Sequence, residues 1–140
     1  MFPLRVVLDT NIVVSAALKP ESLQRTVLLL ALSKPVSLYI SEAILEEYAD
    51  VLARPELAIR KGLRQQFLQL IKNNSRVVSP NRRIEVTSDP DDNIFVECAD
   101  AARADYLITG NRKHFPAFWK STKVITTRDF IELAAPHLIL

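Results

Sequence analysis

The amino-acid sequence predicts an α/β domain in which a mainly parallel sheet of four or five strands is flanked by helices on both faces. Short apolar runs rich in β-branched residues alternate along the chain with longer stretches of helical periodicity. Strands that are separated by helices pair in parallel, and the helices then cover the sheet. The 140 residues contain no repeat, low-complexity tract or linker, so we expect a single domain over residues 1–140.

The elements follow one another in a regular order. The expected strands are RVVL (5–8), SLYI (37–40), YLIT (106–109) and KVIT (123–126). The expected helices lie within residues 22–33, 41–52, 59–74, 91–105 and 128–135. The longest irregular piece, residues 73–92, is rich in turn-forming residues, and its VV and IEV runs are candidates for short edge strands.

The composition argues against several enzyme classes. With only two glycines, Gly62 and Gly110, the chain has no glycine-rich phosphate loop and no dinucleotide-binding fingerprint. Its single cysteine, Cys98, forms neither an intrachain disulfide nor a clustered zinc site, and we interpret it as a core residue. The two histidines, His114 and His137, suggest no nucleophilic triad. Catalytic chemistry is therefore expected from acidic side chains.

Charged residues are distributed unevenly, although the net charge of +2 indicates little about partners. Four acids cluster in SDPDDNIFVE, and each basic group has an ordinary explanation as a solvated surface. The pattern also permits a basic rim around an acidic centre, which suits a polyanion. The basic groups lie within residues 54–64, 76–83 and 112–114.

The apolar segments are too short to cross a membrane. None reaches the roughly 18 residues that a bilayer requires, and the start MFPLRVVLD does not resemble a signal segment, so we expect a cytoplasmic protein. The run TVLLLAL (26–32) is one place for a homodimer contact, and the alternative is an ordinary core helix.

Polar residues interrupt the chain directly after two expected strands. Asp9 follows RVVL, and a carboxylate is tolerated there only at the carboxyl end of the strand, where open α/β sheets place ligand sites. The alternative is that Asp9 caps a helix beginning near Ile12. Thr109, Gly110 and Asn111 follow YLI in the same way, so both clusters are expected on one edge of the sheet.

In the predicted helix SEAILEEYADVL, the acids differ in their position relative to the apolar stripe. Its apolar stripe is centred near Tyr48, and at about 100° per residue Glu47 lies on the boundary of that stripe. Glu46 and Asp50 face solvent, and the helix dipole explains Glu42. Glu47 is therefore the acid able to lean toward the sheet.

The run SDPDDN predicts the start of another helix. Asp89 followed by Pro90 is typical of a cap and a first helical residue. Asp91 and Asp92 then share the first turn, where two adjacent carboxylates repel each other and a helix gains little from the second. We infer that one of them has a cation partner.

Together these segments resemble the PIN domain, the small α/β nuclease fold of many toxins in bacterial and archaeal toxin-antitoxin modules. The resemblance runs nearly end to end, and the ordered combination is more specific than DTN alone. The segments that carry it are VVLDTNIVVSA, ISEAILEEYADVLARPEL, SDPDDNIFVECADAARADYLITGNRKHF and VITTRDF.

The resemblance implies an endoribonuclease that uses Mg²⁺ or Mn²⁺ to cleave single-stranded RNA, and an antitoxin protein as partner. It implies catalytic and metal-binding roles for Asp9, Glu47 and Asp92, with Asn111 where many relatives have a fourth Asp. Oxygen ligands suit these ions, and a metal-activated water needs no covalent nucleophile. The residues expected to support the carboxylates are Thr10, Asn11, Asp91 and Thr109; those expected along the RNA path are Arg112, Lys113 and His114.

Two other functions remain open at this point. One is a non-catalytic PIN-like RNA-binding or adaptor domain, in which the surviving acids bind an ion weakly. The other is a phosphotransferase with Asp9 as phosphoacceptor, which DTN disfavours because it lacks a second Asp and no Lys stands at a strand end.

Overall fold

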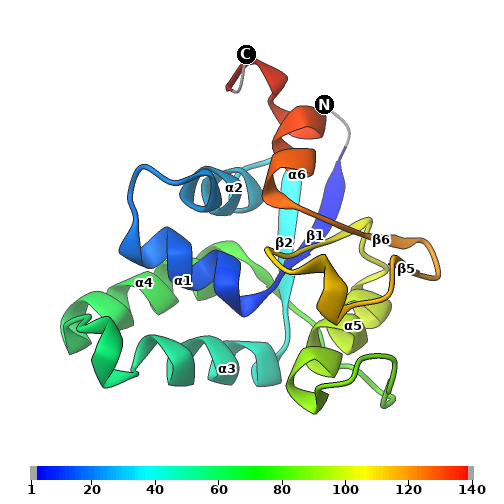
Figure 1. Cartoon of the computed structure of the whole chain (residues 1–140), viewed down its shortest axis with the longest axis horizontal. Coiled ribbons are helices and arrows are strands. Elements are labelled where there is room, and N and C mark those ends of the chain that lie inside the picture. The colour runs from blue at the N-terminus through cyan, green and yellow to red at the C-terminus, as the bar shows by residue number, and fades with distance from the viewer. Residues whose placement is uncertain (1–2, 139–140) are drawn as a thin grey trace.

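A computed structural model describes residues 3–138 as an α/β fold with helices on both faces of one sheet (Figure 1). The strands are β1 (Leu4–Leu8), β2 (Val36–Ile40), β3 (Arg76–Val77), β4 (Tyr106–Ile108), β5 (Phe118–Trp119) and β6 (Thr122–Ile125). The α-helices are α1 (Thr10–Leu18), α2 (Leu23–Ala31), α3 (Glu42–Leu52), α4 (Lys61–Asn74), α5 (Pro90–Ala102) and α6 (Thr127–Ala134). Three 3₁₀ turns are η1 (Pro55–Leu57), η2 (Arg112–His114) and η3 (Pro136–Leu138).

The sheet has the order β3-β2-β1-β4-β6-β5, and only β5 runs antiparallel to its neighbour. The mainly parallel sheet is confirmed, but it has six strands where we expected four or five. Both edge strands have only two residues: β3 coincides with the VV candidate, whereas β5 is too short for a sequence pattern.

Only one of the two candidate edge strands forms a ladder. β3 includes the first valine of VV, whereas IEV is not a strand. The backbone of the IEV segment is held by side chains of α5 instead. Ile84 N donates to Glu97 Oε2 (3.0 Å), and Val86 N donates to Asn93 Oδ1 (3.3 Å).

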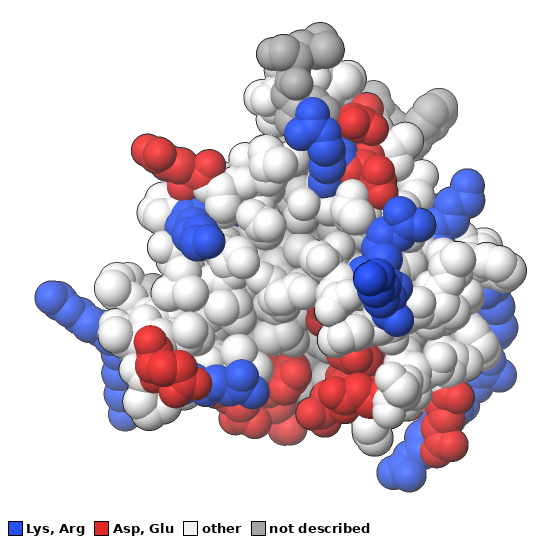
Figure 2. All heavy atoms as spheres, viewed as in Figure 1, with Lys and Arg blue, Asp and Glu red and all other residues white. Residues whose placement is uncertain are grey.

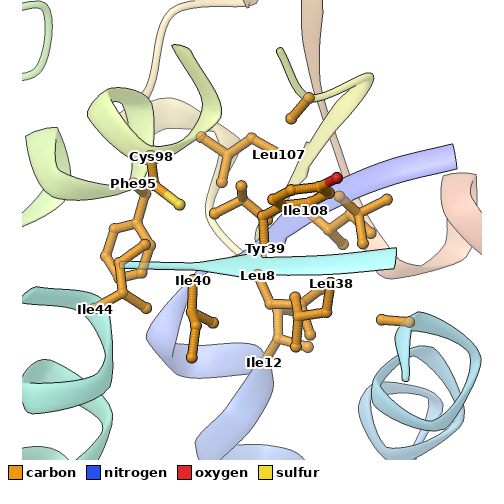
Figure 3. Close-up of a cluster of buried hydrophobic side chains, with 14 of the residues drawn as sticks. Leu8, Ile12, Leu38, Tyr39, Ile40, Ile44, Phe95, Cys98, Leu107 and Ile108 are labelled. Atoms are coloured by element: carbon orange, nitrogen blue, oxygen red, sulfur yellow. The ribbon is translucent and has the colours of Figure 1, made fainter. Parts of the chain in front are cut away.

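The core lies on both faces of the sheet, with α1 and α2 on one side and α5 on the other (Figures 1 and 3). Cys98 is buried as expected, and burial raises the pKa of its thiol to about 12. Helix α2 buries Val27, Leu28 and Ala31, as a core helix would, and leaves Leu29 exposed. Within residues 3–138 no helix is long and apolar enough to cross a bilayer.

Helix α5 begins at a capping aspartate and ends at a residue in the left-handed conformation. Asp89 caps it by accepting from Asp91 N (3.0 Å), and Pro90 is its first residue, as the sequence predicts. At the other end, Arg103 adopts the left-handed conformation with φ of 51°. Glycine is the residue that usually adopts this conformation, and in other residues the conformation is unfavourable by about 1 kcal/mol.

Candidate active site

The carboxyl ends of β1 and β4 bring two polar segments together. Leu8 pairs with Ile108 in a parallel register, and Asp9 N donates to the Ile108 carbonyl oxygen (2.9 Å). Thr109 follows directly and is fully buried. The two segments therefore meet on one edge of the sheet, at the point where the connections on either side of β1 diverge.

The Asp9 carboxylate is both a helix cap and a buried acid. Its Oδ1 accepts from Thr10 N (2.7 Å), so α1 begins two residues earlier than Ile12. Its Oδ2 accepts from the Thr109 hydroxyl (2.7 Å), and only 6% of the residue is exposed. Burial raises the pKa of Asp9 by more than these two hydrogen bonds and the charge of His114 lower it.

Asp92 is the acid that lies within electrostatic reach of Asp9. It stands in the first turn of α5, and 16% of its side chain is exposed. Burial raises its pKa, the charges of Asp9 and Asp89 raise it further, and His114 opposes them. Two neighbouring acids that both resist ionisation form an environment that a cation would relieve.

His114 lies between Asp92 and Asn111, a position that the sequence did not reveal. Its Nδ1 is 3.5 Å from Asp92 Oδ2, and its Nε2 is 3.0 Å from the side-chain nitrogen of Asn111. Asn111 N in turn donates to the Thr109 hydroxyl (3.0 Å). The one available signal was the three-residue spacing of Asn111 and His114, which one 3₁₀ turn brings to the same side.

Glu47 approaches the site beside Asp91 and Thr10. It is half-buried on α3, whereas Glu46 is exposed. Burial raises the pKa of Glu47, and the charge of Asp91 raises it next, whereas Arg54 lowers it. The structure thus brings Asp9, Asp92, Asn111 and Thr109 together and leaves Glu47 beside Asp91.

A hydrogen bond ties the helix that carries Glu47 to the strand that carries Asp9. The neighbouring Tyr48 is fully buried, and its hydroxyl donates to the Leu8 carbonyl oxygen. Burial raises the pKa of Tyr48, so the phenol stays protonated as a donor. Any shift of α3 therefore has to disturb the end of β1.

The remaining residues that we expected to support the carboxylates have different contacts. Asn11 is exposed, and its Oδ1 accepts from Gly110 N (3.3 Å) rather than holding a carboxylate, because it points across to the end of β4. A Cβ on Gly110 would meet Asn11 Nδ2 at 3.2 Å. Asp91 is exposed, and its charge acts on Glu47.

The donor atoms of the site fit a hard divalent cation, although the carboxylates are spread out. Among residues 3–138 no three Asp, Glu, His or Cys side chains lie close enough together to hold a metal as they stand. Mutual repulsion favours that separation. Among residues 3–138 the buried Thr10 hydroxyl oxygen has no hydrogen-bond partner, and it lies near enough to Glu47 to lower the pKa of that acid. Carboxylate and amide oxygens are ligands that Mg²⁺ and Mn²⁺ accept.

The surface around the site is divided by charge. In the view of Figure 2, acidic side chains gather at the lower edge, where α3 and α5 begin, and basic side chains lie on the side of β5 and β6. Arg112 and Lys113 are exposed on η2, directly after Asn111. In this view other basic side chains lie on the opposite, left side of these acids, so cations flank the acidic group on both sides.

This parallel sheet with acids at its carboxyl edge is the architecture of a PIN domain, and the chain belongs to the PIN-domain family, whose family model matches residues 5–113. The protein MJ1680 of Methanocaldococcus jannaschii, itself uncharacterised, is 28% identical over 141 residues, which cover 92% of this chain and 90% of that protein.

A solved structure has the same fold. It is the crystal structure of VapBC2 from Rickettsia felis bound to a DNA fragment from their promoter. The TM-score is 0.60 with 18% sequence identity, over 87% of this chain and 98% of that one. At this level of identity the likeness establishes the fold.

Proposed function

We propose that the protein is a metal-dependent endoribonuclease that hydrolyses phosphodiester bonds of single-stranded RNA. The observation that carries the proposal is the pair Asp9 and Asp92, two partly desolvated acids with raised pKa values at the carboxyl edge of a PIN-domain sheet. A protein keeps such a repulsive pair most readily where a ligand offsets it.

The proposed roles carry over from the PIN-domain resemblance to the acids of this site. Asp9, Glu47 and Asp92 would hold Mg²⁺ or Mn²⁺ with the amide oxygen of Asn111, and such an ion would make a bound water acidic enough for attack on phosphorus. Thr109 fixes the Asp9 carboxylate through its hydroxyl, and its own backbone is held by β6, because Thr109 N donates to the Ile125 carbonyl oxygen (3.0 Å).

The test is cleavage of a mixed RNA pool by the full chain with Mg²⁺ or Mn²⁺ and with EDTA, beside calorimetric titration of Mn²⁺. Cleavage that EDTA abolishes supports the proposal. Binding of Mn²⁺ without cleavage supports the second candidate, a non-catalytic RNA-binding domain. Asn111 favours that candidate, because it adds no charge where many PIN domains have an acid.

We further propose that the protein is the toxin of a toxin-antitoxin pair. The support is the PIN-domain family and the fold shared with a chain of the VapBC2 structure, in which VapBC2 is bound to a DNA fragment from their promoter. A small gene that overlaps the upstream end of this one, and whose product relieves growth arrest on co-expression, would support an antitoxin partner. Growth that is unaffected by expression of this chain alone would contradict the toxin role.

Asn111→Asp is expected to tighten Mn²⁺ binding at least about tenfold, because it adds a negative charge at nearly the same shape beside Asp92. It is also expected to permit a second ion, since three carboxylates nearly neutralise one divalent cation but leave two ions under-neutralised. Calorimetry measures both affinity and stoichiometry. Asn73→Asp, which adds the same charge on exposed α4, is the control. Unchanged affinity and stoichiometry would place Asn111 outside the ligand set.

Replacing Arg112 and Lys113 together by Ala is expected to weaken RNA binding, because both exposed cations directly follow Asn111. The slope of log affinity against log salt should fall by about 0.7 for each phosphate that the variant no longer neutralises. The matched control replaces Arg60 and Lys61, an exposed basic pair where α4 begins. A salt slope that both double variants leave unchanged would make Arg112 and Lys113 ordinary solvated residues.

A further inference from the structure

A polar cleft with a volume of about 540 Å³ lies along β1 and β2, away from the acids at the carboxyl edge of the sheet. It extends from the amino end of β1 to the pair that Tyr39 of β2 forms with Arg76 of β3. Asp9 follows the carboxyl end of β1, so most of that strand, roughly 13 Å, separates it from Arg5. The polar residues that line the cleft are Arg5, Ser37, Tyr39, Arg76, Arg103 and Asp105.

The cleft is strongly basic. Three arginines from distant parts of the chain meet one aspartate there, which leaves a formal charge of +2. Asp105 already accepts from the backbone N of Arg5 (2.8 Å). Within the described part of the chain, the side chains of Arg76 and Arg103 make no hydrogen bond or salt bridge, so both guanidinium groups remain available to a ligand.

Arg5 is held in place as a preorganised donor. Its Nη1 donates to the Ala102 carbonyl oxygen (3.0 Å), and its guanidinium carbon lies 5.7 Å from the centre of the Tyr39 ring. These contacts use one edge and one face of the guanidinium. Within residues 3–138 its other N–H groups make no hydrogen bond, and they keep the planar arrangement that recognises phosphate oxygens.

Arg103 has a backbone conformation that is unfavourable for any residue with a side chain. Its φ of 51° would be relaxed in glycine, and the residue closes α5 through a backbone N–H bond to the Ala99 carbonyl oxygen. A strained residue whose exposed cation lines a basic cleft is a reason to look for a functional role. Because glycine would suit this backbone better, the presence of arginine is explained by its side chain.

We propose that this cleft is an exosite that binds backbone phosphates of an RNA strand away from the bond that is cut. The inference rests on the proposed ribonuclease function. An RNA strand is favoured over a free nucleotide because three arginines converge, whereas the one aromatic ring that lines the cleft, Tyr39, is buried beneath Arg5 and offers no surface for a base.

The experiment measures binding of a long fluorescein-labelled single-stranded RNA to the full chain in EDTA, which keeps the RNA intact, together with the melting temperature. Arg103→Gly is expected to weaken binding by about three- to tenfold and to lower the salt slope by about 0.7, because one phosphate is no longer neutralised. Its melting temperature should stay equal or rise, because glycine relaxes the positive φ.

Lys120→Gly is the matched control. Lys120 also has a positive φ, of 50°, and also carries one positive charge, but it lies outside the cleft and is paired with Asp100. It should leave RNA affinity near the wild-type value. Arg76→Gln, on exposed edge strand β3, tests the cleft without touching a helix end and should weaken binding as Arg103→Gly does.

Wild-type affinity in both Arg103→Gly and Arg76→Gln would overturn the exosite, as would equal losses in Lys120→Gly. Pyrophosphate added as a competitor distinguishes the two sources of phosphate. Binding of pyrophosphate that depends on Arg103, with RNA affinity unchanged, would overturn the assignment to RNA. Cleavage with Mn²⁺ is scored separately, so a chain that cuts RNA normally but shows no effect in EDTA refutes the exosite alone.

Discussion

Asp9→Asn and Asp92→Asn are each expected to lower the rate of RNA cleavage at least about 100-fold, because loss of a ligand should exceed the 10–100-fold cost typical for a residue that only supports one. Asparagine retains an oxygen that can accept from Thr10 N, so the cap of α1 survives. The readout is single-turnover cleavage with Mn²⁺. Wild-type cleavage by either variant would place the site elsewhere.

The same two variants should melt at the same or a higher temperature, and the difference should depend on pH. A carboxyl group whose pKa is raised on folding opposes folding when ionised, so its penalty is present above the folded-state pKa and vanishes below the unfolded-state value near 3.8. The gain in melting temperature should therefore be largest near neutral pH and shrink as the solution is acidified. Destabilisation at neutral pH would contradict the repulsion argument.

Glu47→Gln is expected to slow RNA cleavage at least about 100-fold, as removal of a metal ligand would, without unfolding the chain. Removing its charge should also stabilise the metal-free protein slightly, since burial and Asp91 both raise the pKa of Glu47. The measurement is cleavage rate against Mn²⁺ concentration, and we expect the variant to need more Mn²⁺.

Glu46→Gln provides the matched control for that prediction. Glu46 neighbours Glu47 on α3 but is exposed, so its removal should change neither the rate nor the Mn²⁺ requirement. Equal effects of the two substitutions would show that the position of Glu47 at the boundary of the buried face has no catalytic meaning.

The parts of the fold that local chemistry determines were predictable from the sequence. Asp89 and Pro90 mark the start of α5 because a cap and a first-turn proline act within a few residues. The meeting of Asp9 with Thr109 followed from parallel strands, whose carboxyl ends share one edge. A two-residue strand such as β5 carries no such pattern, which is why the sequence predicts too few strands.

Contacts made by tertiary packing could not be predicted in this way. His114 reaches Asp92 because η2 folds back toward α5, and Asn11 is drawn to Gly110 across the ends of two strands. The basic cleft is a third case, since Arg76 and Arg103 become neighbours only when the sheet and α5 are assembled. The spacing of these residues along the sequence does not predict these contacts.

The hydrogen bond from Thr109 N to Ile125 has a consequence for the synthesis of the protein. Asp9 leaves the ribosome early, but its partner Thr109 is held by β6, more than a hundred residues later. At ordinary translation rates that gap corresponds to roughly 6–20 s. An unfinished chain therefore carries the acids without the arrangement that joins them. If the protein cleaves RNA as proposed, a nascent chain gains the complete set of contacts around Asp9 only after β6 has been made.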